Sequence, residues 1–215
     1  MNILVTGTSK GIGQKIAQKF LLEGHVVYGL DILDSSIKDD NYHHYKVDVR
    51  DKNLPDIDNI NILINNAGVQ DEDSAIEVNL LGAINVSEKY AFASSMKSIL
   101  FICSAAARNG AEFPLYCASK GGLVTYMKNL ALKVAKAGVT CNSISPGGVN
   151  TSLNEHILNS EELYEKVLNE NLFHRWADPE EIADWAYFLT VINKSMTGED
   201  LLIDNGEMLK SNFIW

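Results

Sequence analysis

The sequence predicts an α/β fold, a three-layer, doubly wound parallel sheet of about seven strands with helices on both faces. Short apolar runs rich in Val, Ile and Leu alternate with longer segments whose apolar residues recur at a helical period. Runs that are apolar throughout suit strands covered on both faces, and the segments between them supply the crossovers. Strands are expected at residues 2–5, 25–31, 44–48, 61–66, 98–104, 139–145 and 200–203, and helices at residues 13–23, 74–96, 114–137, 160–169 and 179–192.

Composition predicts one domain that covers residues 1–215, with 46% hydrophobic and 21% charged residues. The net charge of −10 argues against nucleic acid or an anionic membrane surface as the main partner. No apolar stretch approaches the roughly 18 residues of a membrane span, and the first strand starts too early to leave room for a signal peptide. Cys103, Cys117 and Cys141 form no metal-type spacing, so we expect no metal, reduced thiols and a cytoplasmic protein.

The first strand runs into a glycine-rich turn, Thr6 to Gly13, with the sequence TGTSKGIG, and then directly into a helix. Glycines let the backbone approach a ligand closely, and the amino end of the helix suits a pyrophosphate. By itself this pattern is equally typical of a merely tight turn. The second strand ends at Asp31, where a dinucleotide site places the carboxylate that holds the adenosine ribose. Asp31 favours NAD over NADP, whereas Lys10 leaves NADP(H) open because a cation there can hold a 2′-phosphate.

The connections of residues 32–43 and 49–60 are unusually short for parallel crossovers and leave room for at most a short helix each. This side of the sheet should be thinly covered. Asp48 and Val49, at the end of the third strand, are candidates for contact with an adenine, although a plain loop aspartate is equally consistent with the pattern.

The fourth strand ends in Asn65-Asn66-Ala67-Gly68, where two tiny residues let the chain pass close to a flat ligand. Asn79 follows within an otherwise apolar helix. Since a buried amide without partners costs about 1–3 kcal/mol, Asn79 is either a functional group or a structural amide.

The fifth strand ends at Ser104, and Tyr116 follows twelve positions later at the start of a long helix. Tyr116 and Lys120 are i and i+4, so they share one helical face. An ammonium beside a phenol favours the phenolate and lowers the tyrosine pKa, which equips the pair for proton transfer near neutral pH. The pattern Y-x-x-x-K alone is more often a core tyrosine with a solvated lysine.

After the sixth strand, Pro146-Gly147-Gly148 breaks the chain. The polar, helical segment of residues 151–178 has the size and position of a lid over a ligand, or of an ordinary surface helix pair. Asp178, Pro179 and Glu181 then mark the start of the last helix.

These motifs, in this order, resemble the short-chain dehydrogenase/reductase family across nearly the whole chain. The resemblance rests on TGTSKGIG, NNAG, Asn79, Ser104, Tyr116-x-x-x-Lys120, Pro146-Gly147 and TGEDLLIDNGE. It implies a Rossmann-type sheet, binding of NAD(P)(H) and interconversion of carbonyls and alcohols, with homodimers or homotetramers common.

The resemblance also implies roles for individual residues. Tyr116 would be the acid/base, Lys120 would lower its pKa and hold the nicotinamide ribose, Ser104 would donate to the substrate oxygen, and Asn79 would hold a relay water. The cofactor would be lined by Gly7, Ser9, Ile12, Asp31, Asp48, Val49, Asn66, Ala67, Gly68, Pro146, Gly147, Val149 and Thr151, with Lys10 beside them.

The chain departs from the family in its shortened crossovers and in a Ser104–Tyr116 spacing one residue shorter than usual. The leading hypothesis is an NAD(H)-dependent oxidoreductase acting on a secondary alcohol or ketone. An NADPH-dependent 3-oxoacyl-thioester (acyl-carrier-protein) reductase is the runner-up. A catalytically silent NAD-binding regulatory protein is the alternative of another class, suggested only by the thinned adenine side.

Overall fold

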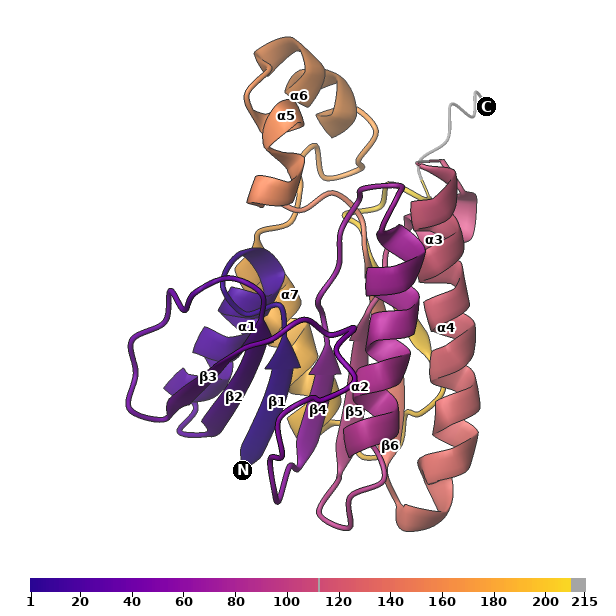
Figure 1. Cartoon of the computed structure of the whole chain (residues 1–215). Coiled ribbons are helices and arrows are strands. Elements are labelled where there is room, and N and C mark those ends of the chain that lie inside the picture. Colours follow the sequence, from indigo (N-terminus) through magenta and orange to yellow (C-terminus); the bar gives the residue numbers. More distant parts are fainter. Residues whose placement is uncertain (112, 210–215) are drawn as a thin grey trace.

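A computed structural model of the chain describes residues 1–111 and 113–209, so the predicted single domain is described as far as residue 209. Seven strands form one sheet in the order β3-β2-β1-β4-β5-β6-β7, and every neighbouring pair is parallel (Figure 1). The strands are β1 Asn2–Thr6, β2 Val26–Asp31, β3 Tyr42–Lys46, β4 Ile62–Asn65, β5 Ser98–Ile102, β6 Thr140–Pro146 and β7 Asp200–Ile203. The doubly wound parallel sheet predicted from the sequence is confirmed.

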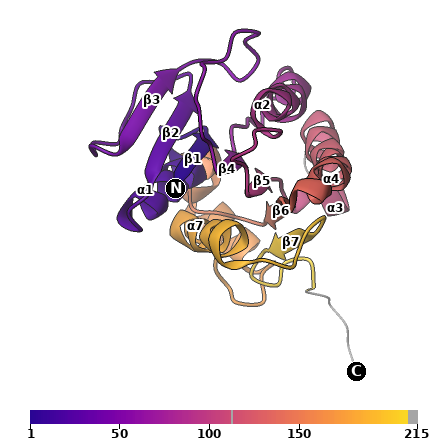
Figure 2. The same ribbon diagram turned by 90° about the horizontal axis from the view of Figure 1, so that it is seen from below.

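Helices cover both faces of the sheet (Figure 2). On one face lie α1 (Gly11–Leu22) and α7 (Pro179–Tyr187), which the π-helix η4 (Phe188–Ile192) continues. On the other lie α4 (Pro114–Val134) and α2 (Ala83–Tyr90), which follows the π-helix η1 (Ile76–Gly82). Because side chains alternate along a strand, Leu4 of β1 packs toward α2 and α4, while Ile3 and Val5 pack toward α1 and α7.

The short helices include α3 (Ala106–Asn109) and the 3₁₀ turn η2 (Ala135–Ala137). Between β6 and α7 the chain forms η3 (Ser152–Asn154), α5 (Glu155–Leu158) and α6 (Glu161–Leu168), which rise above the carboxyl ends of the strands (Figure 1). The capping box expected at the start of α7 is present, with the Asp178 amide donating to Glu181 over 2.9 Å.

Neither short crossover on the β3 side contains a helix, which agrees with the prediction of at most a short helix in each. Side chains replace the missing cover. Tyr42 crosses over Gly29, where a Cβ would lie 2.1 Å from its Oη, and its Oη lies 2.7 Å from Oγ1 of Thr8. On the opposite face, Leu54 and Ile60 of the second crossover pack into the core as loop residues.

The predicted boundaries were wrong at three points. The helix expected at residues 74–96 ends at Tyr90, because the Ser95 hydroxyl donates to Ile60 O over 2.8 Å and holds the chain in a turn before β5. β5 ends at Ile102, so Ser104 lies two residues beyond the strand, where the chain turns into α3. β3 ends at Lys46, so Asp48 likewise lies in the following loop.

Candidate active site

The turn between β1 and α1 is closed tightly by glycines and by one amide. Gly7 has a φ of +74°, and a Cβ on Gly13 would lie 2.1 Å from Gly7 O. The Asn66 side chain donates to Thr6 O over 2.9 Å and to Gly7 O over 3.1 Å, which ties the end of β4 to this turn. The local sequence therefore builds a backbone cradle at the switch point of the sheet, where open α/β sheets bind ligands.

Asp31 ends β2 beside this cradle, and its side chain is buried. One carboxylate oxygen accepts from the Ser9 amide over 2.8 Å and the other accepts from the Leu33 amide over 2.9 Å. Asp31 is thus aimed at the turn itself.

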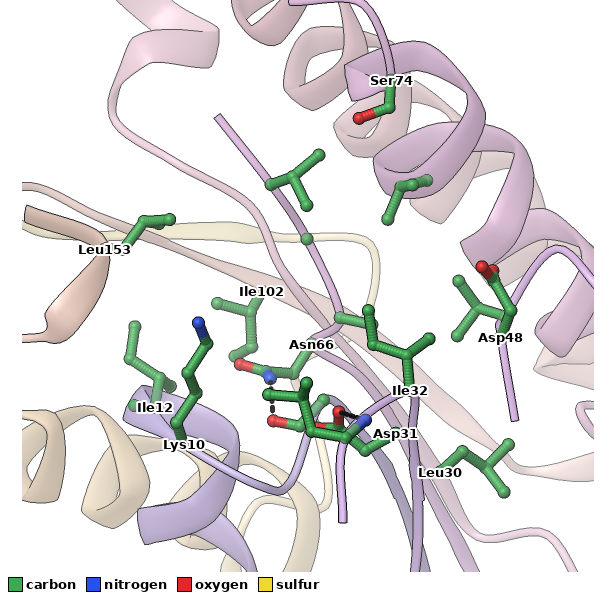
Figure 3. Close-up of a pocket in the computed structure, with 18 of the residues that line it drawn as sticks. Lys10, Ile12, Leu30, Asp31, Ile32, Asp48, Asn66, Ser74, Ile102 and Leu153 are labelled. Atoms are coloured by element: carbon green, nitrogen blue, oxygen red, sulfur yellow. Dashed lines mark hydrogen bonds between the residues drawn. The ribbon is translucent and has the colours of Figure 1, made fainter. Parts of the chain in front are cut away.

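The cradle opens into a pocket of about 470 Å³ at the carboxyl edge of the sheet (Figure 3). Leu153 of the segment above the sheet and Asp48 after β3 lie on opposite sides of it. Twelve of the residues expected at the site line this pocket: Gly7, Lys10, Ile12, Asp31, Asp48, Val49, Asn66, Ala67, Gly68, Tyr116, Lys120 and Thr151. The pocket therefore joins the predicted dinucleotide residues to the tyrosine–lysine pair.

Six expected residues are not in that lining: Ser9, Asn79, Ser104, Pro146, Gly147 and Val149. Asn79 and Val149 are buried behind it, and Ser9 turns its amide toward Asp31. Sequence reasoning missed several lining residues, among them Arg50, Ile102 and Leu153. The apolar ones carry no signal that separates a pocket wall from a core position.

Arg50 also changes the environment of Asp48. Its guanidinium lies 2.6 Å from the Asp48 carboxylate and holds the pKa of that carboxyl below its usual range. The Asp48 side chain is therefore engaged by Arg50 rather than pointing alone toward an adenine. A basic residue two positions after Asp48 was the available signal for this pair.

The predicted tyrosine–lysine pair also lines the pocket, from the first turns of α4. Both side chains are buried, and Lys120 Nζ lies 5.9 Å from the centroid of the Tyr116 ring. Nζ donates to Ile102 O over 2.9 Å, and burial lowers the pKa of Lys120. Lys120 is therefore part of the site and not the solvated lysine that the pattern alone allowed.

Asn79 is fully buried within the π-helix η1, and such irregular turns are frequent at functional sites. Its amide accepts from Val69 N over 2.8 Å and donates to Val69 O and to Ser119 Oγ. A Cβ on Gly68 would lie 3.1 Å from Asn79 Oδ1 and 3.3 Å from Lys120 Nζ. Glycine at this position thus leaves the space between the asparagine and the lysine open.

Ser104 is buried two residues before α3, and its Oγ accepts from the Ala106 amide over 3.1 Å. The shortened connection from Ser104 to Tyr116 contains residue 112, which lies outside the described residues.

The residues at the cradle fit a dinucleotide. Ser9 Oγ is buried and has no hydrogen-bond partner among the described residues. Buried hydroxyls usually have a partner, so a bound ligand could supply the one that Ser9 lacks. Gly7 and Gly11 line the pocket without a side chain, while Gly13 is buried behind Gly7, and the amino end of α1 opens onto the same place. In the part of the chain that the structure describes, no cluster of His, Cys, Asp or Glu is arranged to hold a metal ion, and no helix is long and apolar enough to cross a membrane.

Comparison with known proteins identifies the family. A family model described as enoyl-(acyl carrier protein) reductase matches residues 7–207. The chain is 32% identical to 3-oxoacyl-(acyl-carrier-protein) reductase of Buchnera aphidicola, over 94% of this chain and 95% of that protein. The protein belongs to the short-chain dehydrogenase/reductase family and is an NAD(P)-dependent oxidoreductase.

Solved structures agree with the fold. The ligand-free aldohexose dehydrogenase of Thermoplasma acidophilum is 25% identical with a TM-score of 0.88, covering 100% of this chain and 96% of its own. ElxO, solved with NADP bound, is 25% identical with a TM-score of 0.85, covering 97% of this chain and 99% of its own. These two structures therefore share the fold of this protein over nearly its whole length.

Proposed function

We propose that the protein transfers a hydride between NAD(H) and a secondary alcohol or ketone, with Tyr116 as the acid/base. The observation that carries this proposal is the burial of Lys120 beside the Tyr116 ring, in a pocket that also reaches the glycine cradle and Asp31. The nicotinamide, when bound, supplies or accepts the hydride.

In this proposal the chain's own residues manage the proton. The Lys120 ammonium, held by Ile102 O, favours the phenolate of Tyr116, so that the Tyr116 Oη gives a proton to the substrate oxygen or takes it back. The Ser104 hydroxyl donates to the same oxygen. Asn79 holds the chain at Val69 and leaves room at Gly68 for a water beside Lys120.

The test is Tyr116→Phe, which keeps the ring but removes the hydroxyl. We expect turnover of a carbonyl panel, followed by NADH absorbance, to fall at least about a hundredfold, as for loss of a general acid–base group. NADH binding should persist. Retained turnover would refute this role of Tyr116.

We propose NAD(H) rather than NADP(H) as the preferred cofactor. Asp31 is buried and would lie against the 2′-phosphate of NADPH, whereas Lys10 is exposed and free to point away. Comparison of kcat/KM for NADH and NADPH decides the question, and a preference for NADPH would overturn the weight given to Asp31.

The runner-up is an NADPH-dependent 3-oxoacyl-thioester reductase, which the Buchnera relative's name and Lys10 favour. It predicts faster turnover of an acetoacetyl thioester with NADPH than of any simple ketone with NADH. Family membership favours either enzyme over the catalytically silent regulator.

Two further features belong to this proposal. We propose that residues 151–178 form a lid. The bridge between Val149 and Ala177 brings the two ends of this segment together, and Leu153 within the segment lines the pocket. We also expect a cytoplasmic protein that forms a homodimer or homotetramer. Light scattering of the purified protein measures the number of subunits.

A further inference from the structure

An ion pair with a buried carboxylate fastens α3 to the edge of the sheet. The Arg108 guanidinium lies 2.7 Å from the Asp200 carboxylate and also donates to the Asp200 backbone oxygen. The Asp200 side chain is only 8% exposed, and its second carboxylate oxygen accepts from the hydroxyls of Ser143 and Ser145 at 2.7 and 2.8 Å. The pair thus links a four-residue helix to β7 across β6, over 92 positions of sequence.

A second contact holds the same helix. Asn109 Nδ2 lies 3.3 Å from the Met208 sulfur, in the turn after β7. The Ala105 amide donates to Pro146 O over 2.8 Å, so that the chain before α3 is fixed to β6. The β7 strand and the turn after it therefore form the support on which α3 rests.

Ser104 lies two residues before α3 and is hydrogen-bonded to its first turn. Its backbone oxygen accepts from the Ala107 amide over 3.0 Å, and its Oγ accepts from the Ala106 amide. A helix of four residues has little stability of its own, so its orientation depends on tertiary contacts. A rotation of α3 would therefore move the Ser104 hydroxyl relative to Tyr116.

We propose that Arg108 is a positioning residue: through its ion pair with Asp200 it orients α3 and so sets the Ser104 hydroxyl for the substrate oxygen. The inference rests on the proposed function. It gives the shortened connection between Ser104 and Tyr116 a specific support, because a connection with one residue fewer has less freedom to recover the productive geometry.

The experiment compares Arg108→Gln, Asp200→Asn and the double variant with the wild-type enzyme. Lys19→Gln is the control for loss of an ion pair between elements: Lys19 is about as exposed as Arg108 and pairs with Asp184 of α7, far along the chain from Ser104. We expect kcat to fall about tenfold to a hundredfold in each Arg108 or Asp200 variant, with KM for NADH within about twofold of wild type. The double variant should be no slower than the slower single variant, because the two residues act as one unit.

An Arg108→Gln enzyme with wild-type kcat overturns the inference. A rise in KM for NADH as large as the fall in kcat also overturns it, because it would indicate general damage to the enzyme. Thermal denaturation keeps these cases apart, since the control should lose some stability but no activity.

Hydrogen exchange separates this inference from the proposed function. The amides of residues 105–110 should exchange faster in Arg108→Gln than in wild type, while those of residues 6–13 stay unchanged. Faster exchange at residues 105–110 would support the role of Arg108 in holding α3 even if the enzyme turned over no carbonyl. Absence of carbonyl turnover would refute the proposed function but not this role. Unchanged exchange at residues 105–110 refutes the inference whether or not the enzyme is active.

Discussion

Replacement of Gly13 by alanine is the sharpest test of the dinucleotide cradle. The added methyl group would lie 2.1 Å from Gly7 O and 2.3 Å from Asn66 Nδ2. Ordinary contact begins at 3.4 Å, so the methyl group and the Gly7 carbonyl have to move apart by more than about 1 Å. The hydrogen bond from Asn66 to Gly7 O, at 3.1 Å, cannot survive such a shift unchanged.

Two opposing effects set the magnitude. Alanine is preferred over glycine within a helix by about 1 kcal/mol. Overpacking against backbone costs typically about 1–3 kcal/mol, so the clash outweighs the helix propensity. Because the turn that moves is the one that faces the pocket, we expect NADH to bind at least about tenfold more weakly, equivalent to about 1.4 kcal/mol.

The assay is titration of NADH fluorescence with purified Gly13→Ala, beside thermal denaturation. Gly121→Ala is the matched control, because it also places a methyl in a helix but meets only Ala107 O at 3.9 Å. This control should be as stable as wild type or more so, with unchanged NADH affinity. Wild-type affinity in Gly13→Ala would show that the cradle does not bind the cofactor.

Two other predictions concern stability. Tyr42→Phe removes the buried hydroxyl that bonds Thr8, and urea unfolding should show a loss of about 1–2 kcal/mol. Tyr126→Phe removes an exposed hydrogen bond to Glu88 and should lose less, and equal losses would contradict the role of the buried contact. Arg175 lowers the pKa of Glu181 from 4.5 to about 2, so this carboxylate stabilises the fold above about pH 4.5 and the stabilisation is lost as the pH falls toward 2. Glu181→Gln should therefore be less stable than wild type at pH 7, by at most about 1 kcal/mol because the ion pair is exposed. Near pH 2 the two proteins should be equally stable, and a stability difference that does not change with pH would contradict this prediction.

The sequence alone was informative wherever the cause of structure is local. The alternation of apolar runs with helical patterns predicted a parallel sheet of about seven strands, and the short crossovers predicted a thinly covered side with at most a short helix in each. The spacing of Tyr116 and Lys120 placed both on one face of α4, since a helix fixes the direction of residues four apart. Element ends were less predictable, as at Ser104 and Asp48, because a boundary depends on contacts beyond the pattern.

Only the tertiary structure decided which side chains those motifs meet. Asn79 was equally consistent with a structural or a functional amide, and its contacts with Val69 and Ser119 join β4's loop to α4 beside Lys120. The meeting of Arg108 with Asp200 follows from the order of the strands, which places β7 next to β6, and no periodicity records that order. Local geometry depends on residues that are close in sequence, so the sequence pattern predicts it. The partner of a polar side chain depends on how strands distant in sequence pack together, which the pattern does not contain.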